Sequence, residues 1–283
     1  RGGFERGGGG MSTMTTMAPR TAAAIPAGRR NVARILALEA RYEFLKLLRM
    51  PAYVIPTLAF PLVFYLLFGV ALKQGPASTL HFPTYLIATY GAFGVMNAAL
   101  FGLGVGLAVE RGQGWLLFKR ATPMPPLAPY LGKLAMCMLF GAIMVGWLFT
   151  LGATAGGVRL SLATWLSLAG VQIVGAVPFA AFGLAIGYWA GPNSAPAVIN
   201  LISLPAAFGS GMWIPIQMMP GVVRRIAPFL PSYHFAQLAL KTIGMDDHSQ
   251  SVGQGVAVLA VFTLLSLGAA WIGWRRDEGK TFG

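Results

Sequence analysis

Long apolar runs separated by short polar segments organise the chain from about residue 52 onward. A helix of about 20 apolar residues is long enough to cross a hydrocarbon core of about 30 Å. Six runs approach this length, so the sequence predicts six membrane-spanning helices. They cover about residues 52–72, 85–109, 134–155, 164–190, 195–212 and 255–274.

The segment Asn31–Met50, before the first predicted span, mixes apolar and charged positions at helical spacing. Its apolar residues recur every three or four positions and therefore share one face of a helix. These residues are Ile35, Leu38, Tyr42, Leu45 and Leu48. The pattern predicts an amphipathic helix in the cytoplasmic interface of the membrane, able to contact a cytosolic partner. A simple anchor for the first span is the alternative interpretation.

The segment 213–254, between the last two predicted spans, is too polar in its second half to be another span. Its prolines Pro215, Pro220, Pro228 and Pro231 predict short broken helices instead of one long helix. We expect these pieces to re-enter the outer leaflet, where irregular backbone is tolerated against protein or a wet cavity. An ordinary interfacial loop with aromatic anchors is the alternative.

The first 30 residues lack any long apolar run. Residues 1–10 are rich in glycine and are interpreted as a scar, an upstream read-through or a linker. Residues 11–30 are predicted to be disordered. The predicted parts are a disordered tail at 1–30, an interface helix at 31–50, a six-span domain at 51–275 and a cytoplasmic tail at 276–283.

Composition supports an all-α integral membrane protein. Hydrophobic residues make up 56% of the chain and charged residues only 10%, and the mean hydropathy is +0.66. A soluble protein usually carries about 25% charged residues, so the composition argues against a water-soluble enzyme.

The net charge of +13 is typical of a nucleic-acid-binding protein when taken alone. Its distribution indicates topology instead, because the segments on the side of the N-terminus hold 16 Lys and Arg and the opposite segments hold five. This bias predicts that both termini are cytoplasmic. We therefore expect a multi-pass protein of a bacterial-type plasma membrane, without a nucleic-acid partner.

None of the predicted spans contains an Asp, Glu, Lys, Arg or His side chain. Ion-coupled transporters usually carry one at membrane depth, so we expect the energy source to lie in a partner. The fragment Gly279-Lys280-Thr281 does not complete a phosphate-binding loop, because Trp274 stands where the first glycine would be. No catalytic residue and no metal site are predicted.

The longest connection on the predicted inner side, Glu110–Lys133, holds the main candidate for partner contact. Gln113–Arg120 is predicted to form a short helix with exposed apolar side chains, and Thr122-Pro123 ends it. One interpretation is a docking element for a soluble protein. The other is an interfacial helix with an aromatic anchor.

Three parts of the chain follow one another in a characteristic order. They are a helix that ends in Leu48-Arg49, the run Glu110-Arg111-x-x-Gly114 with Thr122-Pro123 and Gly132-Lys133, and the outer segment Ile214–Gln237. In this order they resemble the membrane subunits of type-2 ABC permeases, which export drugs, polysaccharides or glycolipids. The resemblance implies two paired six-span permease chains in membrane lipid, each docked on a separate cytosolic ABC ATPase. That ATPase, and not this chain, would bind ATP and Mg²⁺.

The resemblance also implies which residues couple the ATPase to the membrane helices. The helix after the second span would be the coupling helix, and the amphipathic helix around Glu39–Leu48 would be the second contact. The implied coupling residues are Glu39, Glu43, Glu110, Arg111, Gly112, Gly114, Leu117, Lys119, Arg120, Thr122 and Pro123.

Asn97 and Asn200 are candidates for lining a substrate path, because an amide that faces lipid is costly. A hydrogen bond between helices is the alternative role. With Phe93, Phe101 and Phe208 they would suit an amphipathic, drug-like or lipid- or polysaccharide-linked substrate. The sequence thus predicts the permease half of an ATP-driven exporter. The alternatives are an ATPase-independent channel or facilitator and a membrane scaffold that recruits a cytosolic partner.

Overall fold

The computed structural model describes residues 2–3, 32–49, 51–71, 82–121 and 124–281. By their contacts, residues 1–31 and residues 32–283 form two separate units. The second unit carries the helices, and no strand occurs in the described residues. The predicted disordered tail at 1–30 lies outside the described residues, apart from residues 2–3.

Most helices up to residue 209 coincide with the apolar runs, and short helices follow between residues 216 and 229. The first set is α1 (Val32–Leu48), α2 (Pro51–Phe64), η1 (Tyr65–Ala71), α3 (Phe82–Ala99), η3 (Leu100–Val105), α4 (Gly106–Gly112), α5 (Trp115–Ala121), α6 (Ala128–Thr154), α7 (Leu162–Val174), α8 (Ala176–Trp189) and α9 (Ala195–Gly209). The second set is η4 (Ile216–Met218), α10 (Gly221–Ile226), η5 (Ala227–Phe229), α11 (Pro231–Thr242) and α12 (Val252–Thr281). The π-helical segments η1 and η3 continue their preceding α-helices without a break.

Among the described residues, four helical stretches are long and apolar enough to cross a membrane. They are Phe82–Gly112, Ala128–Thr154, Leu162–Trp189 and Val252–Asp277. These confirm, by length and composition, the predicted spans two, three, four and six.

The predicted first and fifth spans correspond to shorter apolar helices, Thr57–Ala71 and Ala195–Gly209. Pro196 lies in the first turn of α9, and a turn at Gly211, with φ of +75°, follows its end. Because the backbone turns there, α9 stops short of the predicted residue 212. A total of six spans therefore stays a prediction.

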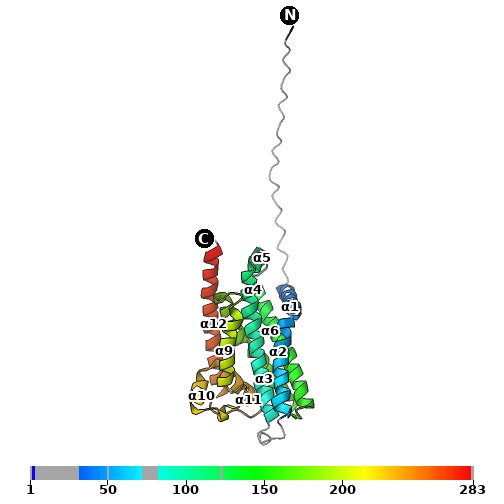
Figure 1. The fold of residues 1–283 in the computed structure, drawn as a ribbon, viewed down its shortest axis with the longest axis vertical. Coiled ribbons are helices and arrows are strands. Elements are labelled where there is room, and N and C mark those ends of the chain that lie inside the picture. The colour runs from blue at the N-terminus through cyan, green and yellow to red at the C-terminus, as the bar shows by residue number, and fades with distance from the viewer. Residues whose placement is uncertain (1, 4–31, 50, 72–81, 122–123, 282–283) are drawn as a thin grey trace. The chain divides into compact units, whose positions relative to one another are not determined.

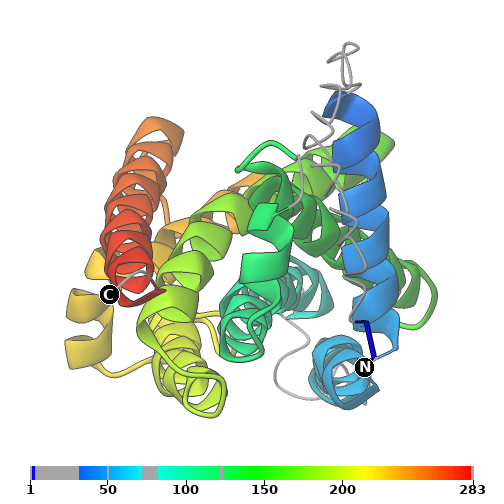
Figure 2. The same ribbon diagram turned by 90° about the horizontal axis from the view of Figure 1, so that it is seen from above.

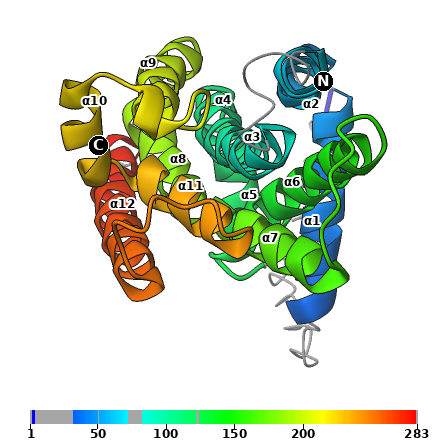
Figure 3. The ribbon, with the colours of Figure 1, turned by 90° about the horizontal axis from the view of Figure 1, so that it is seen from below.

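α3 lies at the centre of the bundle, where every residue from Tyr85 to Met96 is buried. α8 packs beside it and also contacts α12, α6 and η3. Views from above and below show α1 and α2 on one flank of this centre and α12 on the other (Figures 2 and 3).

The two ends of the bundle differ in what they carry. Figure 1 shows α5 and the C-terminal end of α12 at one end, with α10 and α11 at the other. We call the first the α5 end and the second the α11 end. The segments predicted to lie inside meet at the α5 end, since Arg111 pairs with Asp277 and a Cβ on Gly112 would touch Pro192.

The outer segment folds into the short broken helices that its prolines predict. α11 is the most buried of them and packs against α3, α7, α9 and α12. The imidazole of His234 lies between the carbonyl oxygen of Pro228 at 2.8 Å and the side chain of Gln250 at 2.5 Å. The segment thus packs across the α11 end of the bundle. That it re-enters the membrane stays a prediction.

The junction of α7 and α8 allows α11 to approach closely. A Cβ placed on Gly175 would lie 2.0 Å from the ring of Phe235. We expect Gly175→Ala to lower stability by about 1–3 kcal/mol, the usual penalty of overpacking a core. Gly170→Ala on α7 is the matched control, because a Cβ there meets nothing within 4 Å. Thermal unfolding in detergent checks this; equal melting temperatures for the two variants would contradict the packing.

Candidate functional site

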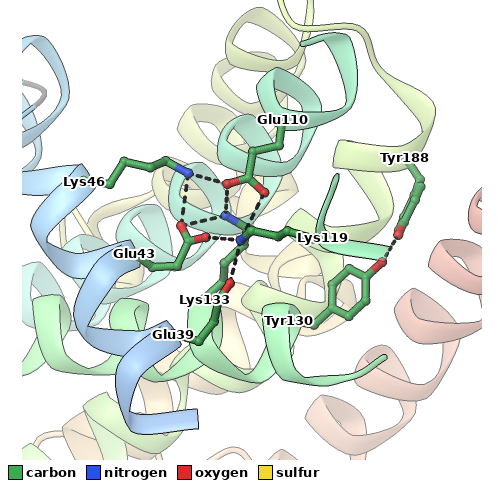
Figure 4. Close-up of polar contacts among 8 residues, drawn as sticks. All are labelled: Glu39, Glu43, Lys46, Glu110, Lys119, Tyr130, Lys133 and Tyr188. Atoms are coloured by element: carbon green, nitrogen blue, oxygen red, sulfur yellow. Dashed lines mark hydrogen bonds and ion pairs between the residues drawn. The ribbon is translucent and has the colours of Figure 1, made fainter. Parts of the chain in front are cut away.

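Six charged side chains from four helices meet at the α5 end (Figure 4). α1 supplies Glu39, Glu43 and Lys46, while α4, α5 and α6 supply Glu110, Lys119 and Lys133. We call this group the ion network. It contains three carboxylates and three ammonium groups, so its formal charge is zero.

Lys133 is the most buried member of the ion network, with 1% of its surface exposed. Its Nζ lies 2.8 Å from Oε2 of Glu43 and 2.7 Å from Oε1 of Glu110. An unpaired ammonium group would be costly at this depth, whereas paired charges that also form hydrogen bonds are tolerated. Lys133 therefore joins α1, α4 and α6 through two buried carboxylates.

Lys119 and Lys46 complete the ion network nearer to its surface. Nζ of Lys119 lies 2.6 Å from Oε1 of Glu39 and 2.7 Å from Oε1 of Glu43. Lys46 lies 3.1 Å from Glu43 and also contacts Glu110, and its side chain is about half exposed. Lys119 therefore fastens the short helix α5 to α1.

Local sequence explains why these helices come together. Glu39 and Glu43 are four residues apart and share a face of α1. Lys46 lies three residues after Glu43 and therefore on the same face. A Cβ on Gly132 would lie 2.5 Å from Cγ of Glu39, so the absence of a side chain lets α1 approach α6. The Gly132-Lys133 pair thus supplies both the close contact and the buried charge.

Burial and pairing act in opposite directions on the pKa of Glu43. Burial alone would raise this pKa, but the ammonium groups of Lys133, Lys46 and Lys119 outweigh it and lower the pKa from 4.5 to about 2. Burial alone would lower the pKa of Lys46, and the carboxylates of Glu43 and Glu110 raise it instead. Both groups are therefore charged at neutral pH.

This shift predicts acid sensitivity. The folded chain holds the pKa of Glu43 below its unfolded value, so ionised Glu43 favours folding and protonation weakens it. We expect stability to be constant above pH 4.5 and to fall between pH 4.5 and about 2. Melting temperature measured against pH checks this, and Glu43→Gln should flatten that part of the profile. An unchanged acid slope in Glu43→Gln would show that other groups cause it.

A second set of contacts fixes the end of α4 to α8 and α12. The guanidinium of Arg111 lies 2.7 and 3.2 Å from the carboxylate oxygens of Asp277 and donates to the carbonyl of Gly187 at 2.6 Å. It also lies over the ring of Tyr188, 5.4 Å from the centroid. Gly114 then turns the chain into α5 with φ of +74°, a conformation that favours glycine.

α5 therefore has one side that contacts the bundle and one side that is exposed. Leu116 is buried and Lys119 points into the ion network. Trp115 and Phe118, three residues apart, are 59% and 75% exposed and lie together on the adjoining face of α5, which turns away from the bundle. The predicted exposure covered the four apolar residues Trp115–Phe118. It is confirmed for the two aromatic residues and wrong for Leu116, and the side chain of Leu117 lies outside the described parts.

The structure brings Glu39, Glu43, Glu110 and Lys119 together in the ion network. It places Arg111 and Gly112 elsewhere, against Asp277, Gly187 and Pro192, and Gly114 in the turn before α5. The side chains of Leu117 and Arg120, and residues Thr122 and Pro123, lie outside the described parts. The part of these residues in coupling to an ATPase stays a prediction.

Two members of the ion network, Lys46 and Lys133, were not among the predicted coupling residues, although Gly132-Lys133 belongs to the run that carries the family resemblance. In the structure Lys133 lies inside α6, and Glu110 lies inside α4, so the connection is shorter than predicted. The available signal was adjacency, because Lys133 directly precedes the apolar run that begins at Leu134.

The predicted substrate-path residues are only partly brought together. Phe93 of α3 and Phe208 of α9 both pack on Trp213, with ring centroids 5.2 and 5.1 Å away. The side-chain amide of Asn97 donates to the carbonyl of Phe93 at 2.9 Å. Both residues lie in α3, so this hydrogen bond does not connect two helices. Asn200 is exposed on α9, and Phe101 is half-buried against the core. Trp213, at the centre of this aromatic cluster, is a residue that sequence reasoning did not select.

The described residues contain no group of three His, Cys, Asp or Glu side chains that could hold a metal ion. Each carboxylate of the ion network is paired with at least one ammonium group. These pairs join α1, α4, α5 and α6, and Trp115 and Phe118 are exposed beside them on α5.

Comparison with known proteins identifies the family. The family described as ABC-2 family transporter protein matches residues 68–272, from η1 to α12, and this range includes Glu110, Lys119 and Lys133. The protein "Putative transport permease YvfS" of Bacillus subtilis (strain 168) is 28% identical over 226 residues, which cover 79% of this chain and 92% of that protein. The chain therefore belongs to the ABC-2 family of transporters and is a multi-pass membrane permease.

Proposed function

We propose that this chain is the membrane subunit of an ATP-driven exporter and that a separate cytosolic ABC ATPase docks on α5. The observation that carries the proposal is the two-sided character of α5. Lys119 connects it to α1 at 2.6 and 2.7 Å, while Trp115 and Phe118 are exposed on the adjoining face. Exposed aromatic residues on a rigid support are typical anchors of protein interfaces.

The contacts between α5 and its neighbouring helices would transmit a movement of α5 to the rest of the bundle. A displacement of α5 acts on α1 and α6 through the ion network, and on α8 and α12 through Arg111 at the end of α4. Ion pairs and hydrogen bonds at these positions resist stretching more than loose apolar contacts do. ATP-driven movement of a docked partner would therefore reach four helices at once.

The proposed orientation puts the α5 end in the cytoplasm. The charge asymmetry favours it, because inner segments of membrane proteins carry the excess of Lys and Arg, and α1, α5 and the C-terminal end of α12 gather at this end. We further propose a second permease chain, identical or different, a plasma membrane of bacterial type, and an amphipathic, drug-like or lipid- or polysaccharide-linked substrate. The aromatic cluster of Phe93, Phe208 and Trp213 supports an apolar part in that substrate.

Co-expression with an ABC ATPase encoded beside the gene tests the proposal. We expect the two proteins to purify as a complex in mild detergent and the complex to hydrolyse ATP in proteoliposomes. Substrate movement by the purified chain alone, without nucleotide, would support a channel or facilitator. Complex formation with no transport in sealed vesicles would support a scaffold.

A further inference from the structure

A cavity of about 700 Å³ lies on the flank of the bundle. α8 contributes one side of it, α6 and α12 the two others, and α5 with residues 124–127 lies at one end. Most of its lining is apolar, and Leu134, Ala181, Leu184, Leu267 and Trp271 represent the three sides. We call this cavity the flank groove.

The length of the flank groove matches one leaflet of a bilayer. On α12 the lining runs from Thr263 to Trp274, and on α8 from Val177 to Tyr188. Eleven residues of helix rise by about 16 Å, at about 1.5 Å per residue. The hydrocarbon core is about 30 Å thick, so one leaflet contributes about half of it. Both sides of the groove therefore extend from the α5 end to about mid-membrane.

The position of the flank groove limits what can fill it. All three of its sides belong to helices long and apolar enough to cross a membrane. Leu131, Leu267 and Trp271 line it and are also exposed, so it communicates with the surface that would face lipid. An empty apolar space of this size would forfeit dispersion contacts on every side. Acyl chains of the adjacent leaflet surround the flank groove and are available to fill it.

Basic side chains lie at the end of the groove near α5. Lys119 lines this end and is paired with Glu39 and Glu43. Arg275 is not itself a lining residue, but its Cζ lies 3.9 Å from the ring centroid of Trp271, which is one. The neighbouring carboxylate of Asp277 is taken by Arg111 at 2.7 Å. The hydroxyl groups of Tyr130 and Tyr188, both lining residues, are hydrogen-bonded at 2.5 Å (Figure 4). Aromatic and basic side chains of this kind mark the headgroup region of a bilayer.

We propose that the flank groove binds one phospholipid with an anionic headgroup, taken from the leaflet at the α5 end. Its acyl chain lies along α8 between α6 and α12, and its phosphate lies against Arg275. The bound lipid fills the space between α5 and α12, which the protein alone leaves open. This proposal is independent of the ATPase and of the exported substrate.

Lipid binding to the purified full chain tests the acyl site. Native mass spectrometry with added phosphatidylglycerol should show one retained lipid per chain. Leu267→Trp narrows the groove and should weaken this binding about tenfold, the effect of displacing about two buried methylene groups. Leu264→Trp is the matched control, because Leu264 is exposed on the same helix (69%, against 44% for Leu267) but does not line the groove. Equal binding by the two variants would overturn the proposal.

The headgroup preference is tested with phosphatidylcholine as competitor. Arg275→Gln should reduce the preference for phosphatidylglycerol about fivefold, since one basic residue near a charged lipid contributes about 1 kcal/mol. Arg276→Gln is the control, because Arg276 stacks on Trp189 instead of a lining residue. Equal retention of the two lipids by the unmodified chain would refute the anionic site. A change of oligomeric state in Leu267→Trp, without loss of lipid, would assign the groove to protein contact.

A measurement on the unmodified chain keeps the proposal testable if a variant does not fold. Phosphatidylglycerol with brominated acyl chains should quench tryptophan fluorescence, because Trp271 and Trp274 line the groove. Unbrominated phosphatidylglycerol should reverse the quenching, and phosphatidylcholine at the same concentration should not. Reversal by both lipids to the same extent would contradict a specific site.

Discussion

Lys133→Met is expected to lower the free energy of unfolding by about 3 kcal/mol or more, the usual loss when one partner of a buried ion pair is removed. Lys133 is 1% exposed and pairs with both Glu43 and Glu110. Without it, two buried carboxylates share the remaining ammonium groups, and the ion network carries an excess negative charge. Thermal unfolding of the purified chain in detergent measures the loss.

Lys46→Met is the matched control for this prediction. Lys46 contacts the same two carboxylates, but its side chain is 48% exposed. Exposed pairs contribute about 0–1 kcal/mol, so the loss should be several times smaller. Adding Glu110→Gln to Lys133→Met restores equal numbers of charges and should recover part of the stability. Equal losses in the two lysine variants would mean that burial of Lys133 does not determine its contribution.

Trp115→Ala combined with Phe118→Ala is expected to weaken binding of the ABC ATPase at least about a hundredfold. Interface anchors of this type each contribute about 2 kcal/mol, and each 1.4 kcal/mol is a factor of ten in affinity. The bundle itself should keep its stability, because both side chains are mostly exposed. Co-elution of the ATPase with the chain in size-exclusion chromatography measures the effect.

Phe229→Ala is the control for the docking prediction. Phe229 is an exposed aromatic residue on η5, at the opposite end of the bundle from α5. Its removal should leave ATPase binding unchanged. If Phe229→Ala weakened binding as much as the double variant, loss of an aromatic side chain in general would be the cause, and α5 would not be the docking surface.

The apolar runs in the sequence predicted most of the long helices of the fold. Helices such as α6 and α12 are continuous in sequence and structure, because a run of apolar residues satisfies its backbone only as a helix in the membrane. The limits of the shorter helices depended on local backbone features, such as the turn at Gly211. The close packing of α11 beneath α7 and α8 depended on tertiary contacts, such as Gly175 against Phe235, that no local pattern reveals.

Four of the six residues of the ion network were predicted from the sequence, but their connections were not. Glu43, Glu110 and Lys119 stand out because charges are rare in this chain. Their partners come from positions distant in sequence, since Lys133 follows Glu43 by 90 residues. Charge alone does not indicate which opposite charge lies nearest, and burial decides how strongly the pair acts. The sequence predicted exposed apolar side chains on α5, but not that Lys119 points toward α1.

Crosslinking from α5 tests the central proposal most directly. The chain has one cysteine, Cys137, which is buried, so Ala121→Cys introduces one accessible thiol on α5 and keeps both aromatic anchors. In the complex with the ABC ATPase, a short thiol-reactive crosslinker at position 121 should join the two proteins, and the same crosslinker at Phe229→Cys should not. An active complex that crosslinks from position 229, and not from 121, would contradict docking on α5.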